Sequence, residues 1–368
     1  MKLKDDDRII LTLDAGGTNF VFSALQGLQS VVEPVRLPSQ ADNLDASLQN
    51  IISGFHQIIK KLDKKPAATS FAFPAPPDYK NGIIGDLANL PAYQGGVALG
   101  PMLEDKFSLP VLINNDGDLF AYGEAYGGYL DMINDLLEKQ ENPKRYHNLL
   151  GITLGTGFGA GIVSHGRLHE GDNSAPAEIF LLRNKLQPEW SVEEGASIRG
   201  IRRFYARQAG IDPGEAPSPL EIFNIATGKQ AGPQEAAVLA YRRFGEVVGD
   251  ALAQVITMLD GVIVLGGGLA GAYELFLPTL VEEMNRTYHS PNGFEIPRLV
   301  MKAFNLEDEF ERKAFAEGSV TEISVPGSNR NVWYDAEKRT GVGVSKKDTS
   351  DSIAIGAYAL AINYLNNL

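Results

Sequence analysis

Two short glycine-rich turns, each placed directly after an apolar run, constrain the fold of this 368-residue chain more than any other feature. The first is LTLDAGGTNF, from Leu11 to Phe20, and the second is LGITLGTGFG, from Leu150 to Gly159. Each indicates a strand, a turn of small residues and a second strand, which together make a β-hairpin. Because the same pattern occurs twice, the sequence predicts two related α/β halves.

Both turns suit the binding of an anion. A strand that stops at Asp14 and continues through Gly16, Gly17 and Thr18 can point backbone N–H groups outward, with little side chain in the way. The turn at 155–157 repeats this arrangement. A hairpin needs glycine even when it binds nothing, so either turn alone supports a structural interpretation equally well. The pair favours a phosphate site.

Two acidic residues stand out beside these turns. Asp14 ends a strand of Ile and Leu, where a charge is costly unless it serves a metal or a hydrogen bond. Asp116, with Asn115, follows a predicted strand at 110–113, at the end where α/β proteins bind ligands. The alternative is a cap for a helix beginning at Leu119, and Asp118 could fill that cap instead. Two phosphate turns and one acidic group are the parts of a phosphotransferase.

A third glycine cluster, GGGLAG, follows a predicted strand at 262–265. Gly266, Gly268 and Gly271 match the G-x-G-x-x-G pattern of dinucleotide-binding proteins. The cluster lies late in the chain and opens no βαβ array, so we interpret it as a flat backbone surface for an adenine or ribose. Plain packing of a strand against a helix remains the alternative.

Composition narrows the function classes. The length suggests two domains at roughly 100 to 200 residues each. A net charge of −13 argues against a nucleic-acid partner. The arginines at 199, 202, 203 and 207 have helical spacing, typical of a solvated face. No apolar run reaches the roughly 20 residues of a membrane span, and cysteine is absent, which excludes disulfides and thiolate metal sites. We expect a soluble cytoplasmic protein.

Periodicity predicts the remaining elements. Apolar residues recur at three and four from Leu44 to Leu62, which indicates an amphipathic helix. A capping box, Ser218 to Glu221, precedes another helix. Asp351 or Ser352 is expected to cap a final helix. The polar stretch 305–349 receives no assignment. Further predicted helices and strands cover residues 69–73, 102–107, 119–126, 196–207, 219–226 and 233–259.

The order of these motifs resembles the ROK family of sugar kinases and bacterial glucokinases. The similarity covers most of the chain, through LDAGGTN, NLP at 89–91, NNDGDLFAYGE, LGTGFGAGIV, AEI, VEEGAS, VLGGG and SIAIGAYALA. The resemblance implies an actin-like ATPase fold with two α/β domains around a central cleft. It also implies a small domain at 1–115 joined by a C-terminal helix at 351–368, and a large domain at 116–350.

The resemblance implies a role for each motif. The ATP-binding residues would be Asp14, Gly16, Gly17, Thr18, Gly155, Thr156, Gly157, Gly266, Gly267 and Gly268, with Asp14 meeting Mg²⁺ directly or through water. The sugar-binding residues would be Asn89, Asn115, Asp116, Glu178 and Glu193, and Asp116 matches the general base. The implied reaction is transfer of the ATP γ-phosphoryl group to the 6-hydroxyl of a hexose, glucose first, by a homodimer.

One position departs from the family pattern. Many relatives have a cysteine-rich zinc site and a histidine three residues after the glutamate equivalent to Glu178, and that histidine touches the sugar. Here this position is Leu181, and the chain has no cysteine, so we expect no zinc. Leucine cannot bond a sugar hydroxyl, which leaves two alternatives open. One is a kinase for fructose or N-acetylmannosamine, and the other is a weakly catalytic sugar sensor.

Overall fold

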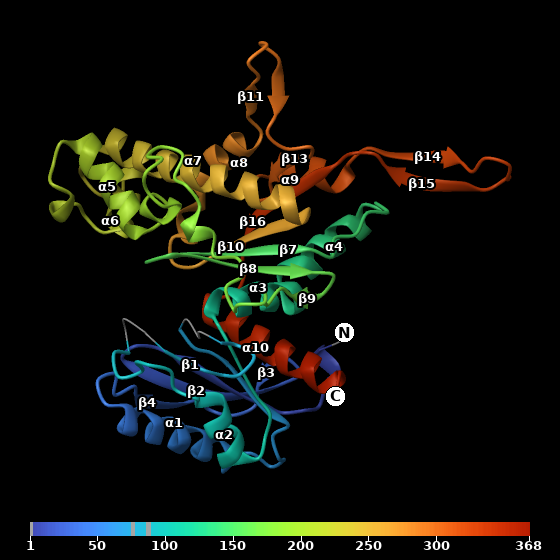
Figure 1. Ribbon diagram of the computed structural model, residues 1–368. Helices are drawn as coiled ribbons and strands as arrows, with labels where there is room; N and C mark the ends of the chain where they lie inside the picture. The colour runs from blue at the N-terminus through green and yellow to red at the C-terminus, as the bar shows by residue number, and fades with distance from the viewer. Residues whose placement is uncertain (1–2, 75–77, 86–89) are drawn as a thin grey trace. The chain divides into compact units, whose positions relative to one another are not determined.

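A computed structural model describes residues 3–74, 78–85 and 90–368 of the chain (Figure 1). The chain folds into two compact α/β units. Unit 1 comprises Met1–Tyr129, Gly161–Ala177 and Lys347–Leu368, and unit 2 comprises Leu130–Ala160 and Glu178–Lys346. The domain division expected at residue 116 stays a prediction, because compact units need not coincide with functional domains.

Unit 1 is built on a mixed sheet with the strand order β3-β2-β1-β5-β6, to which β4 is added beside β2. The central β1 (Ile10–Ala15) pairs antiparallel with β2 (Asn19–Gln26), which confirms the first predicted hairpin. On its other side β1 runs parallel to β5 (Ala68–Ala72), and β5 runs parallel to β6 (Val111–Asn114). The short β3 (Gln29–Ser30) and β4 (Val35–Pro38) complete the edge.

Helices cover both faces of this sheet. On one face lie α1 (Leu44–Ile59) and α2 (Leu99–Phe107), and on the other lies α10 (Thr349–Asn366), with α3 (Asp116–Gly127) packed against α10 (Figure 1). The apolar stripe of α1 buries Ile51, Phe55 and Ile58, as its spacing predicts. α3 and α10 pack backbone against backbone, because a side chain at Gly123 or Gly356 would overlap the carbonyl of the opposite helix.

The central sheet of unit 2 is parallel. Its order is β13 (Lys302–Asn305), β16 (Arg339–Val344), β10 (Val262–Gly266) and β7 (Leu149–Leu154). Every residue of β10 is buried, as a continuous apolar run in a parallel sheet predicts. After β7 the chain turns into β8 (Phe158–Ser164), which ends in unit 1 and pairs there with β9 (Arg167–Leu168).

Three helices of unit 2 match predicted ranges closely: α5 (Ile198–Ala209), α6 (Pro219–Ala226) and α7 (Gln234–Leu259). The others are α4 (Tyr129–Lys139, beginning in unit 1), α8 (Tyr273–Met284) and α9 (Glu309–Glu317), and neither α4 nor α9 was predicted. The capping box at Ser218 and Glu221 is formed. Single 3-10 turns occupy η1 (Leu3–Asp5), η2 (Ile179–Leu181), η3 (Val192–Glu194), η4 (Pro213–Glu215) and η5 (Ala270–Ala272).

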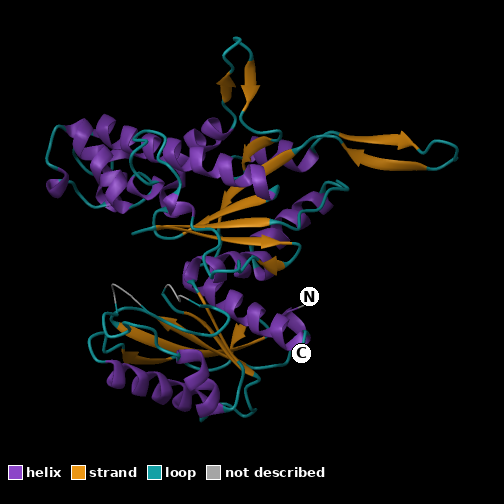
Figure 2. Cartoon of the chain, in the orientation of Figure 1, coloured by secondary structure: helices purple, strands orange, loops and turns teal. Residues whose placement is uncertain are grey.

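The unassigned stretch 305–349 is regularly folded and belongs to unit 2 as far as Lys346. It holds α9, the buried strand β16, and a two-stranded hairpin of β14 (Val320–Ser324) and β15 (Asn331–Asp335) (Figure 2). A second hairpin, of β11 (Thr287–His289) and β12 (Glu295–Pro297), precedes it. Within the described ranges, each helix is too short or too polar to cross a lipid bilayer.

Two predicted helix starts were wrong. The last helix begins at Thr349 with Asp348 as its N-cap residue, so neither Asp351 nor Ser352 caps it. The third helix begins at Asp116, three residues before Leu119, because the Asn115 side chain already accepts a hydrogen bond from the N–H of Asp118. In both places several polar residues could serve as the cap, and composition alone does not choose among them.

Candidate active site

The register of three parallel strands brings Asp14 and Asp116 to one edge of the sheet in unit 1. Asp14 of β1 is opposite Ala72 of β5, and Ala72 is opposite Asn114 of β6. Two inter-strand steps of about 4.8 Å each separate the Cα atoms of Asp14 and Asn114. Asn115 and Asp116 follow at once, so they lie at the same carboxyl edge as Asp14 and the turn after it.

Hydrogen bonds within the first hairpin and from Ser39 fix the first glycine turn, and two of its backbone N–H groups are left available to a ligand. The Gly16 N–H donates to the Asn19 carbonyl at 3.1 Å, and an added Cβ at Gly16 would lie 3.0 Å from that oxygen. Ser39 binds the far side, through its N–H to the Thr18 carbonyl and its hydroxyl to the Gly17 carbonyl. Among the described residues, nothing accepts a hydrogen bond from the N–H of Gly17 or Thr18. These two amides can therefore bind an anion.

Asp14 carries a carboxylate that its surroundings disfavour. Partial burial raises the pKa of Asp14 above its ordinary value, the nearby Arg36 opposes this, and the negative charge of Asp116 adds to it. No hydrogen-bond donor to the Asp14 carboxylate occurs in the part of the chain that the structure describes. An oxygen ligand in this state gains from a hard cation such as Mg²⁺, so the residue fits the metal role expected of it.

The sequence left open whether the Asn115–Asp116 step caps a helix or is available for catalysis, and in the structure Asn115 is the cap while Asp116 is not. Asn115 is the N-cap of α3: its Oδ1 accepts from the N–H of Asp118 at 2.6 Å, and its Nδ2 donates to the hydroxyl of Tyr79 at 2.5 Å. Asp118 is buried in the helix and is not the cap. Asp116 is the first helical residue, and its carboxylate is exposed and accepts the N–H of Gly117 at 2.9 Å. The N-terminus of α3 stabilises this negative charge.

The second glycine turn, in unit 2, is also closed by a backbone hydrogen bond from its first glycine, here to the second residue along the chain, whereas the Gly16 bond reaches the third. The Gly155 N–H donates to the Gly157 carbonyl at 3.1 Å, and the Gly155 carbonyl accepts the N–H of Ile198 at 2.9 Å, at the start of α5. The turn is thus fixed to a helix that begins beside it. Because β7 and β10 are parallel, with Gly266 opposite Thr153, the second and third glycine clusters also share one edge.

The third cluster approaches β7 so closely that only glycine fits. Gly267 has φ +85°, and a Cβ there would overlap the Leu154 carbonyl. The N–H of Leu269 donates to the same oxygen at 3.1 Å. At Gly268 an added Cβ would meet nothing within 4 Å, so the backbone there faces open space. The cluster therefore combines strand packing at Gly267 with an open backbone surface at Gly268.

Glu193 is tied to the second glycine turn. Its Oε2 accepts the N–H of Phe158 at 2.9 Å, and its Oε1 accepts from the Arg199 guanidinium at 2.7 Å. Arg199 also reaches the Thr156 carbonyl at 3.4 Å and pairs with Glu194. The predicted solvated arginine face is thus largely engaged within the protein, and helical spacing gave no signal for this role of Arg199.

For the remaining predicted residues, Glu178, Leu181 and Asn89, the structure gives fewer contacts. Glu178 precedes η2, which packs against η3, the 3-10 turn that carries Glu193. Leu181 is 66% exposed at the end of η2. Asn89 lies outside the described residues. Ser39 and Tyr79, which hold the first turn and Asn115, were missed because a single serine or tyrosine carries no positional signal.

The structure thus gathers the predicted residues into two groups. Unit 1 brings together Asp14, the turn at 16–18, Asn115 and Asp116, and unit 2 brings together the turn at 155–157, Glu193 and the cluster at 266–268. Across the described ranges, no three His, Asp or Glu side chains form a ready-made metal site. Each group offers backbone N–H donors beside carboxylates, which suits phosphoryl transfer to a hydroxyl compound.

Comparison with known proteins identifies the family to which the chain belongs. The ROK family model matches residues 10–305. The crystal structure of a glucokinase from Parabacteroides distasonis ATCC 8503 superposes with a TM-score of 0.91 at 51% identity, covering 99% of this chain and 100% of that one. The N-acetyl-D-glucosamine kinase of Photobacterium profundum is 28% identical over 309 residues, 78% of this chain and 92% of the relative.

A third comparison shows the fold alone. A ROK family glucokinase from Streptomyces griseus, whose crystal structure is a complex with glucose and AMPPNP, is 17% identical with a TM-score of 0.57, over 97% of this chain and 99% of that one. The architecture is the actin-like ATPase fold of sugar kinases. The chain belongs to the ROK family and is one of its sugar kinases. The sugar kinases of this family use ATP with a divalent metal and act on small sugars.

Proposed function

We propose that this chain transfers the γ-phosphoryl group of ATP to the 6-hydroxyl of a hexose, and that glucose is its first substrate. The 51% identity to a glucokinase over the whole chain supports the choice of sugar. The observation that carries the chemistry is the register that sets Asp14 and Asp116 at one sheet edge. Since the reaction consumes ATP, we also propose a cytoplasmic location, and a homodimer as the resemblance implies.

Asp116 is proposed as the general base. Its carboxylate is exposed at the first turn of α3, and Asn115 caps that helix, so Asp116 is not needed for capping. As the bond from the sugar oxygen to the γ-phosphorus forms and the bond to the ADP oxygen breaks, the hydroxyl proton passes to Asp116. A positioned base of this kind contributes roughly 10² to 10⁴ in rate.

The two glycine turns are proposed to bind the phosphates. The amides at 16–18 and 155–157 would meet phosphate oxygens, and the open backbone at 266–268 would face the adenosine. Asp14 would hold Mg²⁺, directly or through water, and the ion would offset the negative charge of the triphosphate. No zinc site is proposed. Fixed dipoles of this kind supply much of the acceleration in phosphoryl transfer.

The sugar hydroxyls are proposed to bind Asn89, Asn115, Asp116, Glu178 and Glu193. Amides and carboxylates pair with the donor and acceptor hydroxyls of a hexose. Glu193 can do this while it holds Phe158 and Arg199, because a carboxylate has about four lone-pair sites. Its sugar contact would therefore be coupled to the position of the second phosphate turn.

A second candidate substrate is N-acetylglucosamine. Relatives at 28% identity and below are named N-acetyl-D-glucosamine kinases. Leu181 gives a physical reason, since an exposed leucine beside Glu178 can contact an acetyl methyl group and cannot bond a hydroxyl. Fructose and N-acetylmannosamine are further candidate substrates. The alternative to an enzymatic function is that of a catalytically weak sugar sensor.

A coupled assay of ADP release separates these possibilities. We expect turnover with glucose, and kcat/KM across glucose, N-acetylglucosamine, N-acetylmannosamine, fructose and mannose ranks the sugars. Asp116→Asn should lower kcat at least about 100-fold. Asp105→Asn removes an exposed carboxylate of α2 and is the matched control. Sugar binding by calorimetry without turnover would favour the sensor, and full activity of Asp116→Asn would refute the assigned base.

A further inference from the structure

The segment from Glu178 to Glu194 carries two proposed sugar-binding carboxylates on short 3-10 turns. It closes on itself by backbone hydrogen bonds: the Val192 N–H donates to the Leu182 carbonyl at 2.7 Å, and the Asn184 N–H donates to the Trp190 carbonyl at 3.0 Å. A loop of this kind takes its position from side-chain contacts with the elements around it. Those contacts therefore decide where the two carboxylates lie.

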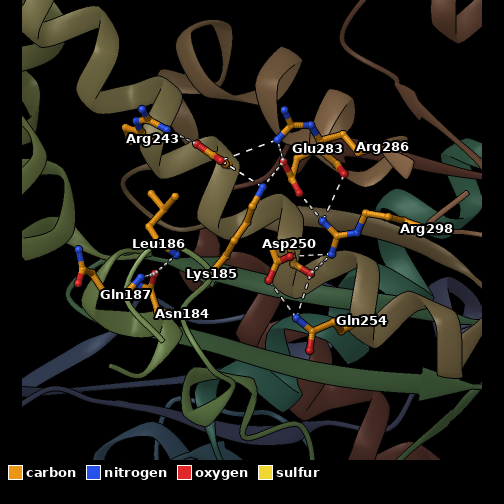
Figure 3. Close-up of polar contacts among 11 residues, drawn as sticks. Asn184, Lys185, Leu186, Gln187, Arg243, Asp250, Gln254, Glu283, Arg286 and Arg298 are labelled. Atoms are coloured by element: carbon orange, nitrogen blue, oxygen red, sulfur yellow. Dashed lines mark hydrogen bonds and ion pairs between the residues drawn. The ribbon is translucent and has the colours of Figure 1, made fainter. Parts of the chain in front are cut away.

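Asn184 fixes the turn at the centre of this segment. Its side chain is buried, and its Oδ1 accepts the N–H of Leu186 at 2.9 Å and of Gln187 at 3.2 Å (Figure 3). A buried amide with two backbone partners holds one local conformation. Lys185, the next residue, therefore projects from a fixed turn.

Lys185 ties the segment to two helices. Its Nζ lies 2.6 Å from Oε2 of Glu283 on α8 and 3.1 Å from Oε1 of Glu246 on α7. Figure 3 shows the lysine side chain reaching from the segment to Glu283, with Arg286 and Arg298 around the same carboxylate. One ammonium group thus links the centre of the loop to both α7 and α8.

The partners of Lys185 stay paired without it. Glu283, with a side chain 3% exposed, also binds Arg286 at 2.9 Å and Arg298. Arg298 is 4% exposed and reaches Asp250 of α7 at 2.7 Å. Removing one partner of a buried pair is severe when a charge is left alone, and here the carboxylate keeps two arginines. Loss of Lys185 should therefore free the loop while α7 and α8 remain joined.

We infer that Lys185 is a positioning residue, which sets the sugar-binding carboxylates Glu178 and Glu193 by tying their segment to Glu283 and Glu246. The inference rests on the proposed sugar-binding role of those two carboxylates. Lys185 itself touches neither substrate in this assignment. Glu193 also keeps its own bonds to the Phe158 N–H and to Arg199, so the second glycine turn stays in place, and loss of Lys185 should act on the sugar mainly through Glu178.

Kinetics of Lys185→Met test this directly. We expect the KM for the best hexose to rise about tenfold, because a loosened loop presents its carboxylates in many orientations. The KM for ATP and kcat at saturating sugar should stay within about twofold. Lys185→Arg keeps the charge and should recover most of the affinity. Lys313→Met, which removes an exposed lysine paired with Glu317, is the matched control and should change none of these values.

Trp190 gives a readout that needs no sugar. The chain has two tryptophans, so Trp333→Phe leaves Trp190, within the segment itself, as the sole emitter. Its ring lies under the Arg203 guanidinium at 4.9 Å. In this background we expect Lys185→Met to increase the fast component of the Trp190 fluorescence anisotropy decay, and Lys313→Met to leave it unchanged.

The outcomes separate the two proposals. A wild-type protein that phosphorylates no hexose refutes the proposed function, and the anisotropy experiment still decides whether Lys185 restrains the segment. An active wild type with an unchanged sugar KM and unchanged Trp190 motion in Lys185→Met overturns the inference. Equal losses for sugar and ATP, with a lowered urea midpoint, also overturn it, because they would show a general effect on stability.

Discussion

The carboxylate of Glu193 accepts the backbone N–H of Phe158 at 2.9 Å. This bond joins a proposed sugar ligand to the strand that leaves the second phosphate turn. Gly157 lies at the same contact, since a Cβ there would come 2.8 Å from Oε2 of Glu193. The proposed sugar and nucleotide contacts in unit 2 thus share one side chain.

We therefore predict that Glu193→Gln raises the KM for both ATP and sugar, whereas Glu178→Gln raises only that for sugar. The glutamine NH₂ must face one of two donors, Phe158 N–H or Arg199, and so loses a bond. A hydrogen bond to a charged group contributes about 1.5 kcal/mol, or about tenfold in each constant. Initial rates with each substrate varied in turn check this. An ATP constant unchanged in Glu193→Gln would show that the turn does not depend on this bond.

The same substitution at two adjacent glycines should affect different properties: stability at Gly267 and ATP binding at Gly268. Gly267→Ala should cost about 2–4 kcal/mol of unfolding free energy, because the residue has φ +85° and its Cβ would overlap the Leu154 carbonyl. Gly268→Ala should change stability by less than about 0.5 kcal/mol and raise the KM for ATP. Urea unfolding and initial rates measure the two effects. Unaltered ATP binding in Gly268→Ala would remove the adenosine assignment.

Asp14→Asn should lose activity and gain stability. The pKa of Asp14 is raised, so the folded protein binds more protons than the unfolded chain over the interval above pH 3.8, and unfolding free energy falls as pH rises through it. The amide removes this penalty. We expect the variant to be more stable at pH 7, with a difference that shrinks toward pH 4, and kcat to fall at least about 100-fold.

Urea unfolding from pH 4 to 8, without nucleotide or divalent metal, measures the gain. Adding ATP and Mg²⁺ should stabilise the wild type and leave Asp14→Asn nearly unaffected, since only a protein that binds the ligands gains from them. A variant that is less stable than the wild type at every pH would show that the ionised Asp14 carboxylate does not destabilise the folded protein.

The base of the β14–β15 hairpin should be sensitive to acid. The pKa of Asp335 is lowered from 3.8 to about 2, despite burial, by hydrogen bonds from Asn142, the Ser319 N–H and Arg339. This contributes about 2 kcal/mol that is present above pH 4 and lost as pH falls toward 2. Asp335→Asn removes the carboxylate that pairs with the buried Arg339 at 2.5 Å and leaves it the more distant, partly exposed Glu337 at 3.8 Å, so it should cost about 3–5 kcal/mol at pH 7.

Urea unfolding of wild type and variant at pH 7, 4 and 3 tests this pair of expectations. Glu317→Gln, in an exposed ion pair with Lys313, is the control and should cost less than about 1 kcal/mol. Equal stability of Asp335→Asn and wild type at neutral pH would mean that the hairpin base does not depend on the ion pair.

Local patterns in the sequence predicted the elements that close on near neighbours. The hairpin around Gly16, the amphipathic α1 and the capping box at Ser218 each depend on residues within a few positions of one another. Their geometry follows from turn chemistry and period, and all three were found. Asp14 and Asp116 were each placed at the end of a predicted strand, and the register of β1, β5 and β6 then shows that the two strand ends lie at one edge.

The features that the sequence did not predict depend on contacts between residues far apart in the chain. The strand β16 reads RTGVGV, with glycines that normally weaken a strand, and it was missed because its partners β10 and β13 supply its stability. Arg199 was interpreted as a solvated side chain since its partners Glu193 and Thr156 lie outside its helix. Neither feature has a local signal to find.

Because α10 belongs to unit 1, the beginning and the end of the chain must meet before that unit is complete. During synthesis, the first 129 residues leave the ribosome long before Thr349–Asn366, so α3 waits with its glycine-lined surface uncovered while all of unit 2 is made. A nascent chain of this protein should therefore stay open to chaperones until α10 has emerged, and a truncation that removes α10 should be as damaging as a mutation in the core.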